Sequence, residues 1–495
     1  MPTPAPSIPP RRRPRVLIWL ALLLPAAVVG PATAQVAQPG DLRYPPLPRF
    51  DIPQPQRVAL DNGLVVMLLE DHELPLISVT ALLRAGSRLD PPEEVGLGAI
   101  TGGVMRAGGT ERLSGDALDD YLESHAAELE VGVHADSGRA SLHVLKQDFP
   151  DLLQLFADVL RRPAFDPAKL ELARRQAIAA VARQNDDPDQ ILDREFRKIV
   201  YGPESPYART PTFATLQKIR REDLIAWHRA HLHPDRMVLG LAGDFDSAAA
   251  LEAVKRAFGD WPRGPAGEPP PSALRRQPSP GVYYAEKDDM SQSKVEMGHL
   301  GVEIRDPDYF ALQVLNEVLS GSFASRLIKH VRTEKGLAYD VGGGVGGAWD
   351  HPGIASLEMS TKTETTGAGI AALLAEARDL TAHPPTDQEV ELAKQSILAS
   401  FVFRADSRSK ILGQQLTFEL FGYPLNWLSR YRTGVESTTT AAVRDAAARH
   451  LHPQDFAILV VGPQKGQDRP LSDFGKVTRI DIAQENTGAP GAPKR

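Results

Sequence analysis

The sequence contains no cysteine among its 495 residues. This absence excludes disulfide bonds, thiolate metal ligands and a cysteine nucleophile. A cysteine-free chain must be stabilised by its hydrophobic cores alone, and a chain of this length can supply them. The length also predicts two or three domains rather than one.

The sequence has no basic stripe after the first fifteen residues. The formal net charge is −7 and the isoelectric point is about 6.0. Proteins that bind nucleic acid usually carry a basic stripe, and none is present here. We therefore expect no nucleic-acid partner. The hydrophobic share of 42% and the charged share of 24% are typical of a soluble globular protein.

The N-terminus has the three parts of a secretory signal. Arginines at 11–13 and 15 precede an apolar run at 16–24, and the small residues Ala32-Thr33-Ala34 follow. This order predicts a signal peptide over 1–34 and an exported, periplasmic protein with no stable membrane insertion after cleavage. Two alternatives stay open, an uncleaved anchor and export by the twin-arginine route instead of the general one.

An internal repeat occurs at an offset of about 220 residues. Two copies at this spacing predict duplicated domains and not a solenoid. The matching segments are His231-Leu232-His233-Pro234 with His450-Leu451-His452-Pro453, Glu171-Leu172-Ala173 with Glu391-Leu392-Ala393, and Tyr201-Gly202 with Phe421-Gly422.

A proline-rich stretch separates the copies, because seven prolines fall between 262 and 280. We predict an N-terminal domain at 45–261, a linker at 262–280, a C-terminal domain at 281–483 and a disordered tail at 484–495. In the first domain, Asp61-Asn62-Gly63 predicts a hairpin turn. In the same domain we expect helices at 96–106 and 188–200 and strands at 129–134 and 139–145. Interspersed strands and helices with short strand connections predict a largely antiparallel sheet covered by helices.

The first domain resembles a known family in the stretches 85–90, 96–98 and 109–110, which read AGSRLD, GLG and GT. They are similar to the frame around the zinc motif of pitrilysin/insulinase peptidases. In that family an H-x-x-E-H motif lies on a helix, where two histidines ligate zinc and the glutamate polarises a water molecule. A glutamate further along the chain completes the metal site.

The family's zinc-site side chains are absent from this sequence. Ala99 and Gly103 stand at the histidine positions, Gly102 at the glutamate base and Ala179 at the distal ligand. A catalytic zinc needs about three protein ligands, and alanine and glycine supply none. The resemblance therefore implies a degenerate metal site and no cofactor in this chain.

Other residues offer weaker metal-site alternatives. His125, His134 and His143 fall on or near neighbouring predicted strands, and the pairs His231/His233 and His450/His452 have H-x-H spacing. The recurrence of these pairs favours a structural role at a helix-to-strand turn. The glycine run at 342–347 lacks the Lys-Ser/Thr of a phosphate loop and predicts a flexible strand edge instead.

The second domain keeps a motif of the same family. The segments are Gly298-His299-Leu300-Gly301, Asp306-Pro307-Asp308-Tyr309, Asn316, Leu319-Ser320-Gly321, Ser325-Arg326-Leu327, Arg332 and Glu334-Lys335-Gly336-Leu337-Ala338-Tyr339. The resemblance implies that Arg332 and Tyr339 bind the peptide substrate. Arginine offers fixed donors to peptide oxygens, and tyrosine offers a phenolic donor to a developing oxyanion. The structural alternative is that Arg332 ends a helix and Tyr339 packs on a strand.

The resemblance covers about 54–465 and implies an α+β fold of two tandem homologous α/β sandwich domains, of the mitochondrial-processing-peptidase-like (LuxS/MPP-like) kind. It implies a subunit that is inactive alone and joins a homologous H-x-x-E-H chain, which holds the zinc, in a heterodimeric endopeptidase. One rival is a non-enzymatic peptide-binding or assembly scaffold. The other is an independent hydrolase with a relocated site.

Overall fold

The computed structural model describes residues 52–265, 274 and 280–482. The predicted signal peptide at 1–34, the tail at 484–495 and most of the predicted linker at 262–280 lie outside the described residues. We call 52–265 the N-terminal half and 280–482 the C-terminal half. Both belong to one compact unit of the chain.

The N-terminal half contains a six-stranded sheet in the order β1-β2-β6-β3-β5-β4. Only the β2–β6 pair is parallel, so the sheet is largely antiparallel, as predicted. The strands are β1 (Gln56–Ala59), β2 (Val65–Glu70), β3 (Leu76–Leu83), β4 (Glu128–Val133), β5 (Gly138–Leu145) and β6 (Met237–Gly243). The helices are α1 (Leu97–Ala107), α2 (Gly115–Ser124), α3 (Phe149–Arg161), α4 (Pro167–Ala182), α5 (Pro188–Tyr201), α6 (Phe213–Lys218), α7 (Arg221–His231) and α8 (Ser247–Phe258).

The C-terminal half repeats this arrangement. Its sheet has the order β10-β12-β8-β13-β7-β14, and β9 pairs separately with β11. The strands are β7 (Gly281–Glu286), β8 (Gln292–Leu300), β9 (Val302–Glu303), β10 (Asp340–Val345), β11 (Gly347–Ala348), β12 (Ile354–Lys362), β13 (Ala457–Gly462) and β14 (Val477–Ile480). The helices are α9 (Tyr309–Asn316), the π-helices η6 (Glu317–Gly321) and η7 (Ile328–Glu334), α10 (Thr366–Ala382), α11 (Asp387–Ser400), α12 (Arg408–Leu420), α13 (Trp427–Ser437) and α14 (Thr440–His450).

The two sheets match strand by strand, which confirms the duplication. Strands β2, β6, β3, β5 and β4 correspond in order to β7, β13, β8, β12 and β10. The outermost strand differs, because β1 precedes β2 in a hairpin whereas β14 comes from the chain's end and pairs in parallel with β7. The predicted turn at 61–63 joins β1 to β2, and the glycine run at 342–347 provides the edge strand β10.

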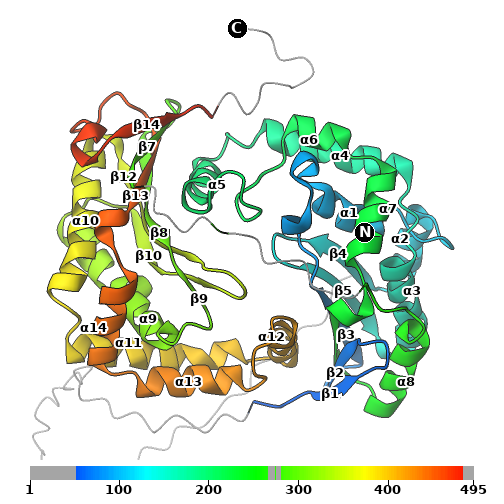
Figure 1. Cartoon of the computed structure of the whole chain (residues 1–495). Helices are drawn as coiled ribbons and strands as arrows, with labels where there is room; N and C mark the ends of the chain where they lie inside the picture. Colours follow the sequence, from blue (N-terminus) through cyan, green and yellow to red (C-terminus); the bar gives the residue numbers. More distant parts are fainter. Residues whose placement is uncertain (1–51, 266–273, 275–279, 483–495) are drawn as a thin grey trace, which may run out of the picture. The chain divides into compact units, whose positions relative to one another are not determined.

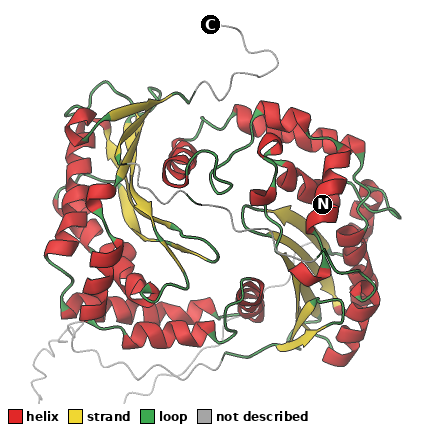
Figure 2. Ribbon diagram, viewed as in Figure 1, coloured by secondary structure: helices red, strands yellow, loops and turns green. Residues whose placement is uncertain are grey.

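Each half covers one face of the other's sheet with a helix. Alternation along β2 sends Val66 and Leu68 into the N-terminal core and Met67 and Leu69 to the opposite face. That face packs against α12, and α5 packs in the same way on β8 and β13 (Figures 1 and 2). Glycine at 240 permits the close approach of α12, because a Cβ atom there would lie 2.8 Å from Leu416.

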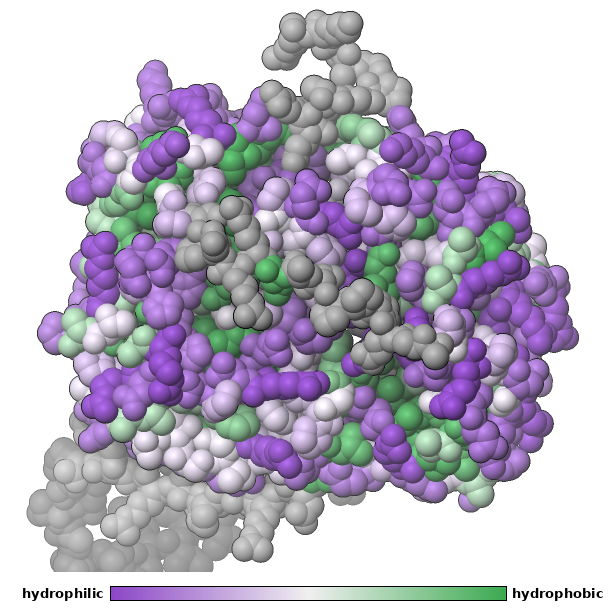
Figure 3. Space-filling view, viewed as in Figure 1, coloured by the Kyte–Doolittle hydropathy of each residue, from purple (hydrophilic) through white to green (hydrophobic). Residues whose placement is uncertain are grey.

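Hydrophilic residues predominate on the face shown in Figure 3, and apolar residues form small separate groups. Within the described ranges, no helix has both the length and the apolar character that crossing a membrane requires. The hydrophobic side chains are instead gathered between each sheet and its helices.

Candidate functional site

Helix α1, which carries the degenerate zinc motif, is held in place by a buried carboxylate. Asp90 is 3% exposed and accepts hydrogen bonds from the backbone N–H groups of Gly96 (3.0 Å) and Gly98 (2.9 Å). Burial raises the pKa of Asp90 to about 6. Gly96, with φ of 106°, adopts a left-handed conformation that favours glycine at the helix N-terminus. The segments 85–90 and 96–98 therefore fix the N-terminus of α1 together.

The two histidine positions of α1 still face solvent. Ala99 and Gly103 lie one turn apart and are exposed, and a Cβ atom at 103 would have no neighbour within 4 Å. Gly102, at the glutamate position, is buried instead. A Cβ atom there would lie 3.0 Å from both the backbone nitrogen and Cγ2 of Val133 on β4.

The fourth degenerate position lies on a neighbouring helix. Ala179 is an exposed residue of α4, which packs against α1. Methyl groups and hydrogen atoms at 99, 102, 103 and 179 provide no electron pair for a metal ion. The residues present do not fit the zinc ion that the family motif would hold.

The two residues that the family resemblance assigns to substrate lie on consecutive elements of the C-terminal half. Arg332 is exposed on the π-helix η7, and Tyr339 is 77% exposed just before β10. The Tyr339 backbone N–H donates to Ser360 at 2.9 Å, which fixes the main chain at the sheet edge. Among the described residues, neither side chain has a hydrogen-bond or ion-pair partner. Both donors are available to a ligand, and their role stays a prediction.

A cavity of about 400 Å³ adjoins Asp340, the residue after Tyr339. It is rich in carboxylates, and its lining consists of Asp189, Leu192, Asp193, Lys294, Glu296, Asp340, Glu358, Met359 and Ser360. Glu296 and Glu358 stand opposite each other on β8 and β12. Burial raises the pKa of Glu296 to about 8 and also raises the pKa of Glu358. The sequence analysis missed these residues, because they come from α5 and three strands and share no local motif.

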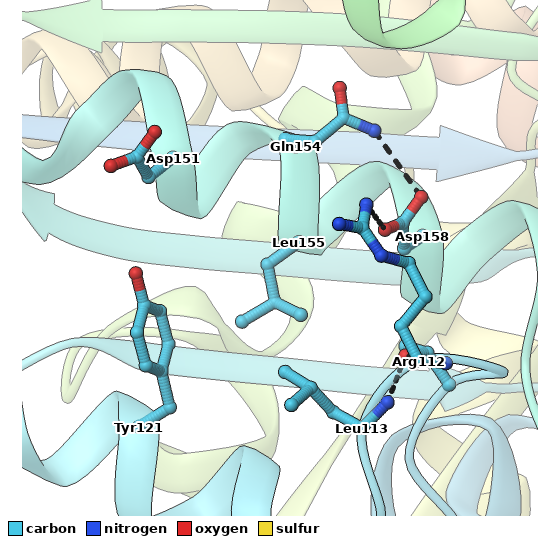
Figure 4. A pocket seen from close by; sticks show the side chains of 8 residues that line it. Arg112, Leu113, Tyr121, Asp151, Gln154, Leu155 and Asp158 are labelled. Atoms are coloured by element: carbon cyan, nitrogen blue, oxygen red, sulfur yellow. Dashed lines mark hydrogen bonds and ion pairs between the residues drawn. The ribbon is translucent and has the colours of Figure 1, made fainter.

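A second cavity, of about 330 Å³, lies between α2 and α3 (Figure 4). Its buried carboxylate, Asp158, accepts hydrogen bonds from Gln154 (3.2 Å) and Arg112 (3.4 Å). The buried carboxylate is thus already paired, and the remaining acidic group of the lining, Asp151, is exposed to solvent. We assign no site to this cavity.

The histidine alternatives do not assemble a metal site in the described part of the chain. His125, His134 and His143 belong to no group of three potential ligands there. The recurring pairs lie where predicted, between α7 and β6 and between α14 and β13. His450 does approach Asp306 and Asp308, but Arg449 also contacts Asp308 at 2.7 Å, so this group is a local ion-pair network.

Comparison with known families matches both halves of the chain. Residues 65–206 match the model of insulinase (peptidase family M16), and residues 218–397 match that of the peptidase M16 inactive domain. The chain belongs to the peptidase M16 family. The two matched ranges contain α1, α4 and the Arg332–Tyr339 segment, so the resemblance predicted from those residues is confirmed.

Two bacterial relatives align over most of their length. The M16 chain is 25% identical to the non-peptidase homologue YmxG of Helicobacter pylori over 81% of this chain and 92% of the relative. It is 23% identical to YmxG of Bacillus subtilis, named an uncharacterized zinc protease, over 82% of this chain and 98% of the relative.

Solved structures establish the M16 fold. A peptidase M16 inactive domain from Pseudomonas fluorescens gives a TM-score of 0.75 at 24% identity and covers 84% of this chain and 99% of its own. A Helicobacter pylori protease gives a TM-score of 0.74 at 18% identity and covers 83% and 100%. These matches confirm the predicted α+β fold. Together with alanine and glycine at the motif positions, the comparisons identify an inactive M16 homologue.

Proposed function

We propose that this M16 homologue is the non-catalytic, substrate-binding subunit of a two-chain zinc endopeptidase that acts on exported peptides or proteins. A homologous partner chain with an intact H-x-x-E-H motif would hold the zinc and the catalytic base. The protein would work in the periplasm, after removal of the signal at 1–34. It would contribute no metal ligand of its own.

The observation that carries this proposal is the contrast between two exposed sites. Ala99, Gly103 and Ala179 offer nothing to a metal, whereas Arg332 and Tyr339 keep unpaired donors at the surface. A peptide bound in extended form presents carbonyl oxygens that a guanidinium and a phenol can bind. Hydrogen bonds from these donors would stabilise a developing oxyanion in the partner's active site most strongly.

The surroundings of Arg332 and Tyr339 support a binding role. Tyr339 leads directly into β10, an edge strand of the C-terminal sheet. Arg332 lies in a π-helix, a form that occurs frequently at functional sites. The residues that precede it include Phe323, which is 84% exposed and could contact an apolar side chain of a peptide.

The direct experiment is purification of the protein from its native host with identification of bound chains by mass spectrometry. Each chain is then expressed alone, and zinc content and peptide cleavage are measured for the single chains and for the mixture. We expect cleavage by the mixture, zinc in the partner, and neither property in this chain alone. The absence of any H-x-x-E-H partner would defeat the proposal.

A second candidate is a non-enzymatic scaffold that binds peptides or assembles proteins. It is favoured by the name of the Helicobacter pylori relative, which is a non-peptidase homologue. Mixing this chain with the partner chain distinguishes the two candidates. A scaffold would bind the partner without changing the partner's rate of peptide cleavage. Stoichiometric complex formation with unchanged cleavage would identify the scaffold.

A further inference from the structure

The acidic cavity beside Asp340 is a site of its own. Helix α5, which packs on β8 and β13, forms one wall, and strands β8, β12 and β10 form the other (Figure 1). The volume of about 400 Å³ falls in the range of roughly 300–1,000 Å³ that is typical of small-molecule sites. The lining includes neither the degenerate zinc-motif positions nor Arg332 and Tyr339.

The strand wall gathers polar side chains from three strands on one face. Residues directly opposite each other on paired strands project to the same side of a sheet. Glu296 of β8 stands opposite Glu358 of β12. Ser360 of β12 stands opposite Lys294 of β8 and Asp340 of β10. All five line the cavity, so this face of the sheet is turned toward α5.

Ser360 brings a buried hydroxyl without a partner to this face. The residue is 7% exposed, and its side chain makes no hydrogen bond to any residue that the structure describes. Alternation along β12 sends Leu357 and Met359 into the hydrophobic core and Ser360 to the cavity side. A buried hydroxyl that makes no hydrogen bond costs free energy. A ligand in the cavity would supply the missing partner.

The aspartates of the α5 wall are already neutralised. The Lys294 Nζ atom lies 2.7 Å from Oδ1 of Asp189, and the Arg197 Nε atom lies 2.8 Å from Oδ1 of Asp193. Each aspartate that α5 contributes to the cavity therefore has a cationic partner. The excess negative charge lies on the strand wall.

Two carboxylates of the strand wall have no such partner. Asp340 and Glu358 form no ion pair with any residue that the structure describes. Burial raises the pKa of Glu358, and the charge of Asp340 adds to this rise. Burial also raises the pKa of Glu296 to about 8, so its carboxyl group is largely protonated near pH 7. The wall thus offers two uncompensated negative charges beside two neutral groups, the Glu296 carboxyl and the Ser360 hydroxyl.

The spacing of these groups favours an extended cation over a metal ion. A metal site brings at least three ligand atoms together around one ion. In the described ranges, no three acidic side chains of this cavity have ligand atoms within 4.8 Å of one another. Leu192, which is 6% exposed, adds an apolar surface to the lining. Separated charges and an apolar contact suit a ligand with methylene groups between its positive ends.

We propose that this cavity binds a linear alkylammonium ligand with two or more positive groups, the chemistry shared by polyamines and by neighbouring lysine side chains of a peptide. Its ammonium groups pair with Asp340 and Glu358, and its methylene stem contacts Leu192. An ammonium group has donors only, so the Ser360 hydroxyl accepts one of its hydrogen bonds. Asp340 and Glu358 are exposed at the rim, where the ligand enters. This inference does not depend on the proposed peptidase role.

Isothermal titration calorimetry of the full-length protein tests the site, in an amine-free buffer with about 0.15 M salt to screen exposed charges. The probes are putrescine and the longer spermidine, and butylamine is the control because it has the stem of putrescine with one ammonium group fewer. We expect saturable binding of the polyamines at one site per chain. Butylamine should bind about tenfold or more weakly than putrescine, because one charged hydrogen bond is lost. Saturable binding of neither polyamine would overturn the inference.

Glu358→Gln and Glu364→Gln form a matched pair of variants. Both glutamates are exposed in the C-terminal half, but only Glu358 lines the cavity. Glu358→Gln should weaken polyamine binding by about tenfold or more, and Ser360→Ala by roughly threefold or more. Glu364→Gln should bind as the wild type does. Equal binding by the wild type and Glu358→Gln would contradict the proposal.

Unfolding of the ligand-free variants separates lost binding from lost folding. Glu358→Gln removes a charge that repels Asp340, and Ser360→Ala removes an unpaired hydroxyl. Neither change should lower the midpoint of denaturant unfolding, so weaker binding by these variants reflects the cavity itself.

Two further ligands identify the chemistry. A blocked lysyl-lysine dipeptide that binds more tightly than spermidine would assign the site to peptide side chains, and the reverse order would assign it to free polyamines. Either result supports an alkylammonium site. Binding of Mg²⁺ that is lost in Glu358→Gln, with no binding of any amine, would overturn the inference in favour of a metal site.

Discussion

Gly102 and Val133 approach so closely that only glycine fits at position 102 without a shift of α1 or β4. A Cβ atom at 102 would lie 3.0 Å from the Val133 backbone nitrogen. The position of the family's catalytic base has thus lost its carboxylate, and a side chain there would need a small shift of Val133. The neighbouring position 103 remains open. Restoring metal ligands should therefore be easier than restoring the base.

We expect the triple variant Ala99→His, Gly103→His, Ala179→Glu to retain about one zinc ion per chain after dialysis. The three side chains would supply the ligands that a catalytic zinc needs, on exposed faces of two packed helices. Peptide cleavage should not return, because position 102 still lacks a base. Zinc is measured by elemental analysis, with Ala99→His alone as the control. Failure of the triple variant to bind zinc would mean that these positions are wrongly assigned.

Gly240→Ala should destabilise the protein by about 1–3 kcal/mol through overpacking between β6 and α12. The added methyl group would meet Leu416 at 2.8 Å and Leu412 at 3.0 Å. Gly413→Ala, on α12 itself, is the matched control. Nothing lies within 4 Å of a Cβ there, so helix propensity should raise stability by roughly 0.5–1 kcal/mol. Denaturant unfolding measures both, and equal effects would show that α12 does not pack on β6 in solution.

Glu296→Gln should stabilise the protein at pH 8 and have little effect near pH 4. Burial raises the pKa of Glu296 from 4.5 to about 8, so between these values the folded state keeps a proton that the unfolded state has lost. Stability therefore falls as the pH rises through this range, and glutamine removes that loss. The gain at pH 8 should be on the order of 2 kcal/mol. The exposed Glu364→Gln is the control, and a gain independent of pH would contradict the assignment.

The mature protein should begin at Gln35 and fractionate with the periplasm, because Ala32-Thr33-Ala34 has the small residues of a cleavage site. Mass spectrometry of the N-terminal peptide from the native host checks this directly. Ala34→Pro should block cleavage and leave a longer, membrane-associated form. An intact Met1 on the wild-type protein in the membrane fraction would show instead that the segment is an anchor.

Local pattern was sufficient to predict much of the fold. The helix expected at 96–106 is Leu97–Ala107, and the strands expected at 129–134 and 139–145 are Glu128–Val133 and Gly138–Leu145. The repeat and the turn at 61–63 were also correct, since both depend on short segments with strong conformational preferences. The family resemblance, carried by the residues around α1 and η7, is confirmed.

Features that join distant segments could not be predicted in this way. Helix α5 was expected at 188–200, but nothing in its sequence shows that it packs on β8 and β13 of the other half. The acidic cavity beside Asp340 depends on the same long-range arrangement. Burial of Gly102 against β4 likewise follows from packing and not from the motif.

Turnover by the assembled two-chain complex tests the central claim most directly. Tyr339→Phe removes one hydroxyl, and Arg332→Lys keeps the charge but loses the planar fork of donors. Both side chains are exposed, so folding and assembly should be unaffected. Each variant is mixed with the zinc-bearing chain, and complex formation is measured separately from peptide cleavage. The account predicts normal assembly with cleavage slowed by about 100-fold or more. Near-normal cleavage by both variants in a fully assembled complex would contradict it.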